Sequence, residues 1–471
     1  MRLNVIIMEE NEEIKNELFD ISDIDANRYS ASPAITSFTL VSNWNKTVED
    51  AMKNAVDKLI RINPILTGRL IKDRNNNKLQ VLSLQHSSFF NVIKGPDNVL
   101  IPDDVYGRIH VIHTQVEPLF DVLGLAIEQI TTGSKLFDVT VCILPSLHAC
   151  YLIQLSHMIA DGASYYMLLK QFQALLNDEE IETLPKLRWV PSPKNVLTPR
   201  FYSEKDANRE LKSWRPAFLN LALTQSQRNS WVHILDTEKM SSYKPGLVLA
   251  AARAQMTVKF LSANDLITAA LAEVFDTELM EMMANMRGRL DGVSMDMAAN
   301  GERGIFFPRK LAASNPEYVR STPLKHFCAW KDSNHMSSYD YAFVASDFSV
   351  ITNWCSLTNF VVPKTTKLLV HTPASDFVKA MPINFCIVFK ADDSGTIAIC
   401  HNMKIETSNY KKRFENSIIF KNIIDHEKEI IPESVQSHWI HVKRWVDSMR
   451  VINRWRSLAW GRNHDSLRDD Q

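Results

Sequence analysis

The sequence predicts an α/β fold, because strands with alternating apolar residues are followed by amphipathic helices in both halves of the chain. In the first half, residues 149–157 alternate as a half-buried strand does, and apolar residues recur at helical spacing from Tyr165 to Leu176. In the second half, Ser262 is an N-cap candidate before an amphipathic segment that ends near Val274. The chain has 471 residues, 45% of them hydrophobic, which is enough for two or three domains with apolar cores.

Further elements are expected around these units. A strand over 34–42 precedes a helix that has Thr47 as its expected N-cap and stops at Asn63, before a proline. Other segments are interpreted as strands: residues 78–87, 107–115, 137–144, 381–389 and 395–401. His110 and His113, three residues apart on one of these strands, would face opposite sides and would not share a metal ion.

Composition and charge exclude several classes of function. The 53 basic and 54 acidic side chains give a net charge of −1, which provides no electrostatic reason to expect a nucleic acid partner. The six cysteines are scattered without a CxxC pair, so neither a zinc site nor a disulfide framework is expected. The sequence shows no secretory signal, no long uncharged apolar run and no glycine-rich nucleotide motif. We therefore expect a cytoplasmic protein that holds no metal and no bound cofactor.

Two domains joined by a crossover are expected. Residues 183–200 are rich in proline and lack periodicity, which is typical of a connection between domains. The expected units are residues 1–182, a linker over 183–214, a second domain over 215–430 and a basic aromatic helix over 431–471. Within the last unit, residues 439–460 carry tryptophans among lysines and arginines. This helix could pack on the protein or a partner, or make a peripheral membrane contact.

His157 is the candidate catalytic residue. It ends the apolar row of the strand 149–157, at the corner where that strand gives way to a helix. A histidine in such a row is often an ordinary core residue. The spacing to Asp161 and Gly162 favours function, because a rigid corner can present an imidazole to a substrate, and a neutral imidazole can accept a proton near neutral pH.

The motif His157-Met-Ile-Ala-Asp161-Gly162 resembles the HxxxDG signature of acyltransferases related to chloramphenicol acetyltransferase. These include the BAHD enzymes, peptide-synthetase condensation domains and wax ester synthases. Other segments resemble BAHD motifs and occur in the same order along the chain: residues 19–25, 63–70, 262–274, 285–290, 299–301 and 348–354. The resemblance spans about residues 19 to 424. The DFGWG motif, expected soon after Trp354, is absent.

The resemblance implies two chloramphenicol-acetyltransferase-like domains, each a mixed β-sheet flanked by helices, with an active-site channel at their interface. It implies an acyltransferase of secondary metabolism that is monomeric and uses acyl-CoA as co-substrate. A small-molecule alcohol or amine would be the acceptor. His157 would remove the acceptor's proton for direct attack on the thioester, without a covalent acyl-enzyme.

The resemblance also implies roles for other residues. Thr352 and Trp354 would lie at the reaction centre and stabilise the oxyanion. Asp161 would pair with Arg287 or Arg289 and hold the corner rigid, although it could instead orient the imidazole as in a triad.

Two other functions stay open. One is a condensation-type or wax-ester-type transferase that uses a carrier-bound acyl group or a long-chain alcohol. The other is a catalytically silent binding protein on the same fold, which the missing DFGWG motif favours and the retained HxxxDG residues oppose.

Overall fold

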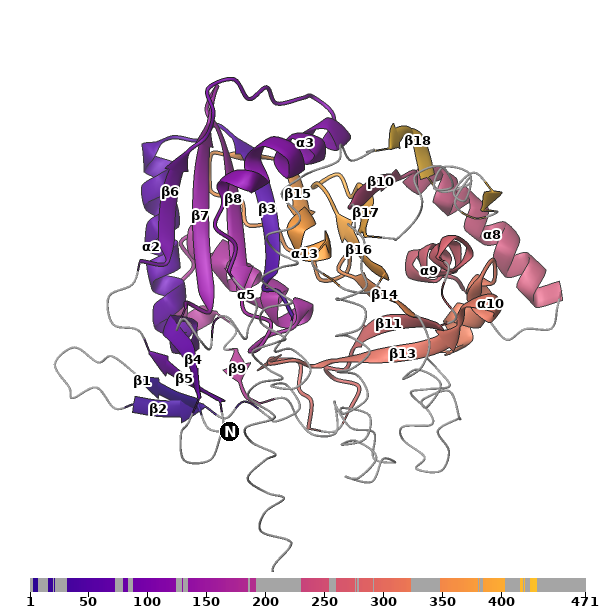
Figure 1. Ribbon diagram of the computed structural model, residues 1–471, viewed down its shortest axis with the longest axis horizontal. Helices are drawn as coiled ribbons and strands as arrows, with labels where there is room; N and C mark the ends of the chain where they lie inside the picture. Colours follow the sequence, from indigo (N-terminus) through magenta and orange to yellow (C-terminus); the bar gives the residue numbers. More distant parts are fainter. Residues whose placement is uncertain are drawn as a thin grey trace, which may run out of the picture.

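The computed structural model of the chain describes residues 3–6, 16–19, 21, 32–72, 79–83, 88–123, 129, 134–184, 187–191, 230–253, 260–275, 277, 279–290, 292–322, 348–379, 381, 384–402, 416–417, 419 and 424–429. In this part of the chain, two larger sheets stand side by side and are flanked by helices (Figure 1).

The first sheet has five strands. In spatial order they are β15 (Lys367–Pro373), β3 (Ile35–Ser42), β8 (His148–Leu155), β7 (Phe137–Leu144) and β6 (Phe90–Lys94). Neighbouring strands run antiparallel except β6 and β7, which are parallel. Leu155 lies opposite both Ile35 and Phe137, so the central strand β8 is paired on both sides up to its last residue. The sheet therefore holds the strand end just before His157 in a fixed position.

Two long helices, α2 (Lys46–Ile62) and α5 (Gly162–Leu176), pack against each other beside this sheet. The Tyr165 hydroxyl lies 2.6 Å from Ser37 Oγ, which joins α5 to β3. The expected N-cap at Thr47 is wrong by two residues, because Asn45 Oδ1 accepts the hydrogen bond from the Val48 backbone N–H.

The expected strand over 107–115 is also wrong, because this segment is helical. It forms α3 (Val105–Val111), a π-helical turn over Ile112–Val116 and a 3-10 turn over Glu117–Leu119. Asp104 caps α3 through the Gly107 backbone N–H, and Ile109, Ile112 and Val116 are buried at helical spacing. His110 and His113 therefore lie on helical turns and not on a strand.

The second sheet has seven strands. In spatial order they are β13 (Glu302–Pro308), β11 (Leu279–Asn285), β14 (Phe348–Asn353), β16 (Asn384–Lys390), β17 (Ile397–His401), β10 (Trp231–Leu235) and β18 (Ile424–Glu429). Three helices accompany it: α8 (Thr237–Arg253), α9 (Ala263–Val274) and α10 (Arg309–Ala312). Ser262 and Asp265 form a capping box at the start of α9, where the sequence predicts the helix to begin.

Smaller elements complete the described structure. They are β1 (Leu3–Ile6), β2 (Asn16–Phe19), β4 (Gly68–Lys72), β5 (Leu79–Ser83), β9 (Arg188–Trp189), β12 (Met297–Ala298), α13 (Ser375–Lys379) and the 3-10 turns Pro64–Thr67 and Ile181–Thr183. None of the described helices has the length and apolar character to cross a membrane.

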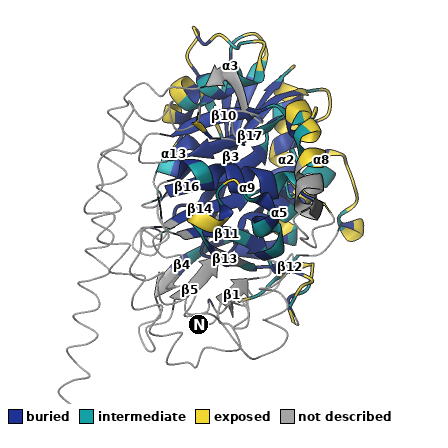
Figure 2. Ribbon diagram, turned by 90° about the vertical axis from the view of Figure 1, so that its right-hand side faces the viewer, coloured by how far each residue is buried: buried dark blue, intermediate teal, exposed yellow. Residues whose placement is uncertain are grey.

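Strand β15 links the two halves of the chain. It belongs to the second half by sequence, yet it pairs with β3 at the edge of the first sheet. From β15 the chain passes through α13, which lies between the sheets, and continues into β16 of the second sheet (Figure 1). One apolar core contains residues of both sheets, such as Phe38 and Ile387, and a second core includes α9. Figure 2 shows that α9 and the strands near it are largely buried.

The expected domain boundaries stay predictions. Most of the linker expected over 183–214 and all of the helix expected over 431–471, which includes residues 439–460, lie outside the described residues.

Candidate active site

The HxxxDG motif occupies the corner between β8 and α5. Strand β8 ends at Leu155, and α5 begins at Gly162. The Ser156 N–H donates to Leu136 O over 2.7 Å, and its hydroxyl donates to Gln129 Oε1 over 2.7 Å. These contacts hold the backbone just before His157, whose exposed fraction is 9%.

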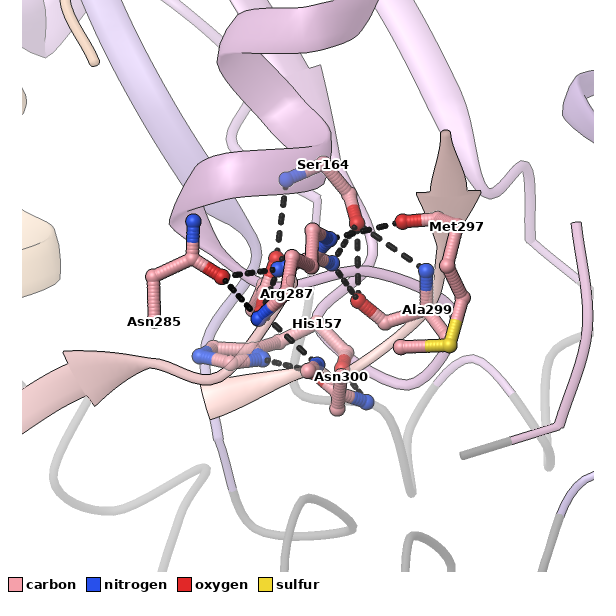
Figure 3. A network of polar contacts seen from close by, with 9 residues as sticks. His157, Ser164, Asn285, Arg287, Met297, Ala299 and Asn300 are labelled. Atoms are coloured by element: carbon pink, nitrogen blue, oxygen red, sulfur yellow. Dashed lines mark hydrogen bonds and ion pairs between the residues drawn. The ribbon is translucent and has the colours of Figure 1, made fainter. Parts of the chain in front are cut away.

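Asn300 contacts the imidazole and the backbone of His157 (Figure 3). Asn300 Nδ2 donates a hydrogen bond to the His157 backbone oxygen over 3.1 Å. The Asn300 Oδ1 atom then faces His157 Nδ1, at 3.2 Å. Because an amide oxygen only accepts hydrogen bonds, the neutral ring carries its proton on Nδ1 and its basic lone pair on Nε2. One side chain thus fixes the orientation and the tautomer of the imidazole.

Asp161 pairs with Arg287 in the interior of the protein. The carboxylate receives two hydrogen bonds from the guanidinium, at 2.9 and 3.0 Å, and both side chains are at most 1% exposed. The backbone N–H groups of Ser164 and Gly301 each donate to it over 2.8 Å. Burial opposes ionisation, but the Arg287 charge and these hydrogen bonds hold the pKa of Asp161 below its ordinary value.

Arg287 joins the corner to the second half of the chain. Its Nε donates to Met297 O over 2.7 Å, and its NH1 group donates to Asn285 Oδ1 over 3.1 Å. Its NH2 group contacts Ser164 Oγ at 2.7 Å and Ala299 O at 2.8 Å (Figure 3). The planar guanidinium is therefore bonded along all of its edges, which fixes the start of α5 relative to β11 and β12.

Trp354 packs against the start of α5. A Cβ atom at Gly162 would lie only 2.9 Å from Trp354 Nε1, so the absence of a side chain at this position lets the indole approach the helix. The Tyr166 ring meets the indole edge-to-face, with ring centroids 5.7 Å apart. The backbone N–H of Trp354 donates to Val388 O over 2.7 Å, which joins this residue to β16. The end of β14 and the HxxxDG corner are thus in direct contact.

Thr352 lies on β14, opposite Ile387 of β16. Its neighbour Ile351 belongs to the core that includes α9, whereas Val350 and Ile387 belong to the core that the two sheets share. Because side chains alternate along a strand, Thr352 is on the face that turns toward the first half of the chain. Its exposed fraction is 9%, the same as that of His157.

Arg289 and His113, which the sequence also singles out, are not part of the contacts described at the HxxxDG corner. Arg289 is exposed, and within the described residues the ion pair of Asp161 is with Arg287. His113 is held by Thr372 and Pro373, and its burial lowers its pKa to about 3. Within the described residues, no group of three or more His, Cys, Asp or Glu side chains could hold a metal ion.

Two residues of the site had no assigned role in the sequence. The sequence points to Asn300 only through residues 299–301, which fall where BAHD enzymes carry a GN pair, and it gives no signal for Ser164. The Ser164 hydroxyl donates to Ala299 O over 2.7 Å and accepts from Ala299 N over 3.0 Å, so it joins α5 to the segment that carries Asn300. The resemblance of this segment to the BAHD motif is the sequence feature that points to Asn300.

No protein-family model and no curated protein sequence matches the chain. Solved structures do match it. The structure of F. sporotrichioides TRI101 complexed with coenzyme A and T-2 has a TM-score of 0.57 at 10% identity, over 86% of this chain and 99% of that one. Vinorine synthase has a TM-score of 0.50 at 13% identity, over 85% and 93%. The chain has the BAHD-like acyltransferase fold.

The BAHD-like fold confirms the fold class that the sequence predicts. Polyketide synthase associated protein 5 from Mycobacterium tuberculosis also matches, with a TM-score of 0.50 at 15% identity over 85% of this chain and 96% of that one. The match to TRI101 extends over nearly the whole length of that protein, so the absence of a DFGWG motif here has not changed the architecture.

Proposed function

We propose that the chain is an acyl-CoA-dependent O- or N-acyltransferase in which His157 Nε2 is the general base. The observation that carries the proposal is the contact with Asn300, which places the ring's proton on Nδ1 and leaves the basic lone pair on Nε2. The fold supports it, because TRI101 with this fold was solved in complex with coenzyme A and T-2.

In the proposed reaction, an acceptor hydroxyl or amine attacks the carbonyl carbon of the acyl thioester. His157 Nε2 takes the proton of the attacking group as the new bond forms. The carbon–sulfur bond then breaks, and the same proton passes from the imidazolium to the leaving thiolate. No residue of the chain becomes acylated, and the base returns to its neutral state.

The developing oxyanion needs hydrogen-bond donors, and two side chains are proposed for this role: Thr352 on β14 and Trp354 directly after it. Trp354 Nε1–H lies beside Gly162, and Thr352 lies on the face of β14 that turns toward the first half of the chain. Donors held by a sheet lose little freedom when they bind the transition state, which favours stabilisation by a fixed site.

Asp161 is proposed to hold the corner and not to transfer protons. It is ionised and paired with Arg287, and Asn300 occupies the position next to His157 Nδ1 that a triad aspartate would need. The amide of Asn300 stabilises the imidazolium through its oxygen without carrying a charge.

The test is turnover of a panel of acyl-CoAs with mixed alcohol and amine acceptors, followed by mass spectrometry of the products. His157→Ala should lower kcat by about 100- to 10,000-fold, the usual contribution of a general base. Asn300→Ala should lower it by about 10- to 100-fold, because a hydrogen bond to a charged group contributes about 1.5–3 kcal/mol. His110→Ala, which changes a histidine on α3, is the matched control and should leave kcat unchanged.

Undiminished turnover by His157→Ala would exclude the general-base role. Competition between free acyl-CoA and an acyl-carrier protein distinguishes the proposal from a condensation-type transferase. Absence of turnover with every donor would favour a binding protein on the same fold.

A further inference from the structure

Glu117 is a buried carboxyl group that the proposed reaction does not use. It begins the 3-10 turn Glu117–Leu119 in the first half of the chain, and its exposed fraction is 3%. Its two carboxylate oxygens accept hydrogen bonds from the first turn of α13, which belongs to the second half. Oε1 accepts from the Asp376 N–H over 2.8 Å, and Oε2 accepts from the Ser375 N–H over 3.1 Å. We call these three residues the Glu117 clamp.

The clamp fixes the segment where the chain returns from the first sheet to the second. Strand β15 pairs with β3 and leads directly into α13. At the other end of α13, Asn402 Nδ2 donates to Val378 O over 2.8 Å and to Met381 O over 2.9 Å. The helix is therefore held at its start by the first half of the chain and at its end by the second.

Helix α13 also contacts the candidate active site. Phe377 follows the clamp directly, and its ring centroid lies 6.3 Å from that of Trp354. Trp354 in turn packs against Gly162 at the HxxxDG corner. A shift of α13 would therefore move Phe377, one of the aromatic rings that pack against the indole and hold it beside Gly162.

The titratable groups that face Glu117 come from every element around it. They are Asp376 and Lys379 on α13, Cys150 on β8 and Cys400 on β17, and His113 on the π-helical turn faces Asp376 and Lys379 of the same cluster. Burial keeps both thiols protonated by raising their pKa values and keeps His113 neutral with a pKa of about 3. Lys379 pairs with Asp376 at 3.2 Å, and the acids around it raise its pKa despite burial, so it stays charged.

Glu117 itself changes state near neutral pH. Burial and the Asp376 charge raise its pKa to about 7, although Lys379, the Asp376 backbone N–H and Ser375 favour the carboxylate. Below this value the cluster has one carboxylate facing one ammonium group. Above it, the buried Glu117 adds a negative charge beside the partly exposed Asp376 carboxylate, and Lys379 is the cation that the described residues of this cluster provide.

We propose that Glu117 is a positioning residue for the acyl transfer: its clamp on α13 sets Trp354 against the HxxxDG corner, and the clamp loosens when Glu117 ionises. The positioning claim rests on the proposed function. The effect of the clamp on stability does not rest on the proposed function, because stability can be measured without substrate.

The direction in which stability changes with pH follows from the linkage between protonation and folding. The pKa of Glu117 is higher in the folded protein than the ordinary 4.5, so the folded state binds the proton more tightly than the unfolded state. The stability that the clamp contributes is therefore fully present at low pH and is lost as the pH rises toward 7. Glu117→Gln removes the charge and keeps one of the two acceptor oxygens, so it lacks the titrating group and should abolish this pH-dependent loss.

The first measurement compares the unfolding equilibrium constants of wild type and Glu117→Gln in urea at about pH 5 and about pH 8. Their ratio should change by about 50- to 100-fold over this interval, given a pKa moved from 4.5 to about 7, with the variant gaining relative stability at high pH. Glu179→Gln, at an exposed glutamate, is the matched control and should give a constant ratio. A constant ratio for Glu117→Gln would overturn the clamp.

The second measurement is kcat of the same proteins across this pH range. The ratio of kcat for Glu117→Gln to that of wild type should rise with a midpoint near pH 7, while the Glu179→Gln ratio stays flat. A pH-dependent stability ratio with a flat kcat ratio would overturn the positioning role. If wild type shows no turnover, the proposed function fails while the stability experiment still decides the clamp.

If Glu117→Gln does not fold, Asp376→Asn replaces it. Removing the neighbouring charge lowers the pKa of Glu117, so the stability of this variant should fall less than that of wild type between about pH 5 and about pH 8. An unchanged fall would overturn the clamp.

Discussion

Arg287 makes hydrogen bonds at the candidate active site to partners from both halves of the chain. The ion pair with Asp161 lies at the centre of these contacts, with both side chains at most 1% exposed. A buried charge that loses its partner is left in a medium that solvates it poorly, so the two residues depend on each other. The pair should matter more for the rigidity of the corner than for the proton transfer itself.

We therefore expect Asp161→Asn to lower the free energy of unfolding by about 3–5 kcal/mol, as is usual when one member of a buried pair is removed. Arg287→Met should cost a similar amount, and the double variant should cost less than the sum of the two. Urea unfolding of the four proteins gives the coupling energy. Additive costs would show that the pair is not coupled.

The pH dependence of the same pair has a definite sign. The pKa of Asp161 is lower in the folded protein than its ordinary value of 3.8. Its contribution is therefore present above about pH 4 and is lost as the pH falls through the lowered value.

At this scale the sequence predicts only part of the site. It identifies His157, Asp161 and Gly162 because their spacing forms a compact motif, and it limits the partner of Asp161 to Arg287 or Arg289. It assigns no role to Asn300, which lies 143 residues from His157. One of the two Asn300 contacts is to a backbone oxygen, which every residue has, so no pairing of side-chain types reveals it.

At the scale of secondary structure, the strand β8 and the helix α5 follow directly from hydrophobic periodicity. The segment 107–115 does not, because a short apolar run fits a strand or a helical turn equally well. The cap at Asp104 and the burial of Ile109, Ile112 and Val116 at helical spacing stabilise the helical conformation. Asp104, an N-cap residue type, is the feature of the sequence that favours a helix here.

Gly162 shows how one element constrains another, and it gives a prediction. In Gly162→Ala the new Cβ would lie 2.9 Å from Trp354 Nε1, so the indole or the start of α5 must shift. We expect a loss of about 1–3 kcal/mol in the free energy of unfolding, as for other overpacked sites. We also expect kcat to fall, and Trp354→Phe in the same protein to restore part of the stability.

The matched control is Gly246→Ala in α8. A Cβ there would meet nothing within 4 Å, so the change should stabilise the protein by about 0.5–1 kcal/mol through helix propensity. Thermal unfolding of both variants measures the two effects. Equal shifts in the same direction would show that the contact with Trp354 has no energetic consequence.

At the scale of the whole molecule, sequence periodicity could not show that β15, from the second half of the chain, pairs with β3 in the first sheet. Periodicity predicts a strand but not the sheet in which it pairs, and the chain after Trp354 lacks the family motif that could have guided the assignment. The result is a core shared by both sheets, in which Phe38 of β3 and Ile387 of β16 belong to one cluster.

The shared core and the pairing of β15 with the first sheet predict that the two sheets unfold together. Neither sheet can lose its structure without exposing apolar residues of the other, so intermediates with one folded half are unfavourable. Urea unfolding followed by far-UV circular dichroism and by tryptophan fluorescence should give coincident transitions. Val370→Ala, at a buried position of β15, should shift both transitions equally, whereas Lys367→Ala at an exposed position of the same strand should shift neither. Two separated transitions would mean that β15 does not couple the sheets.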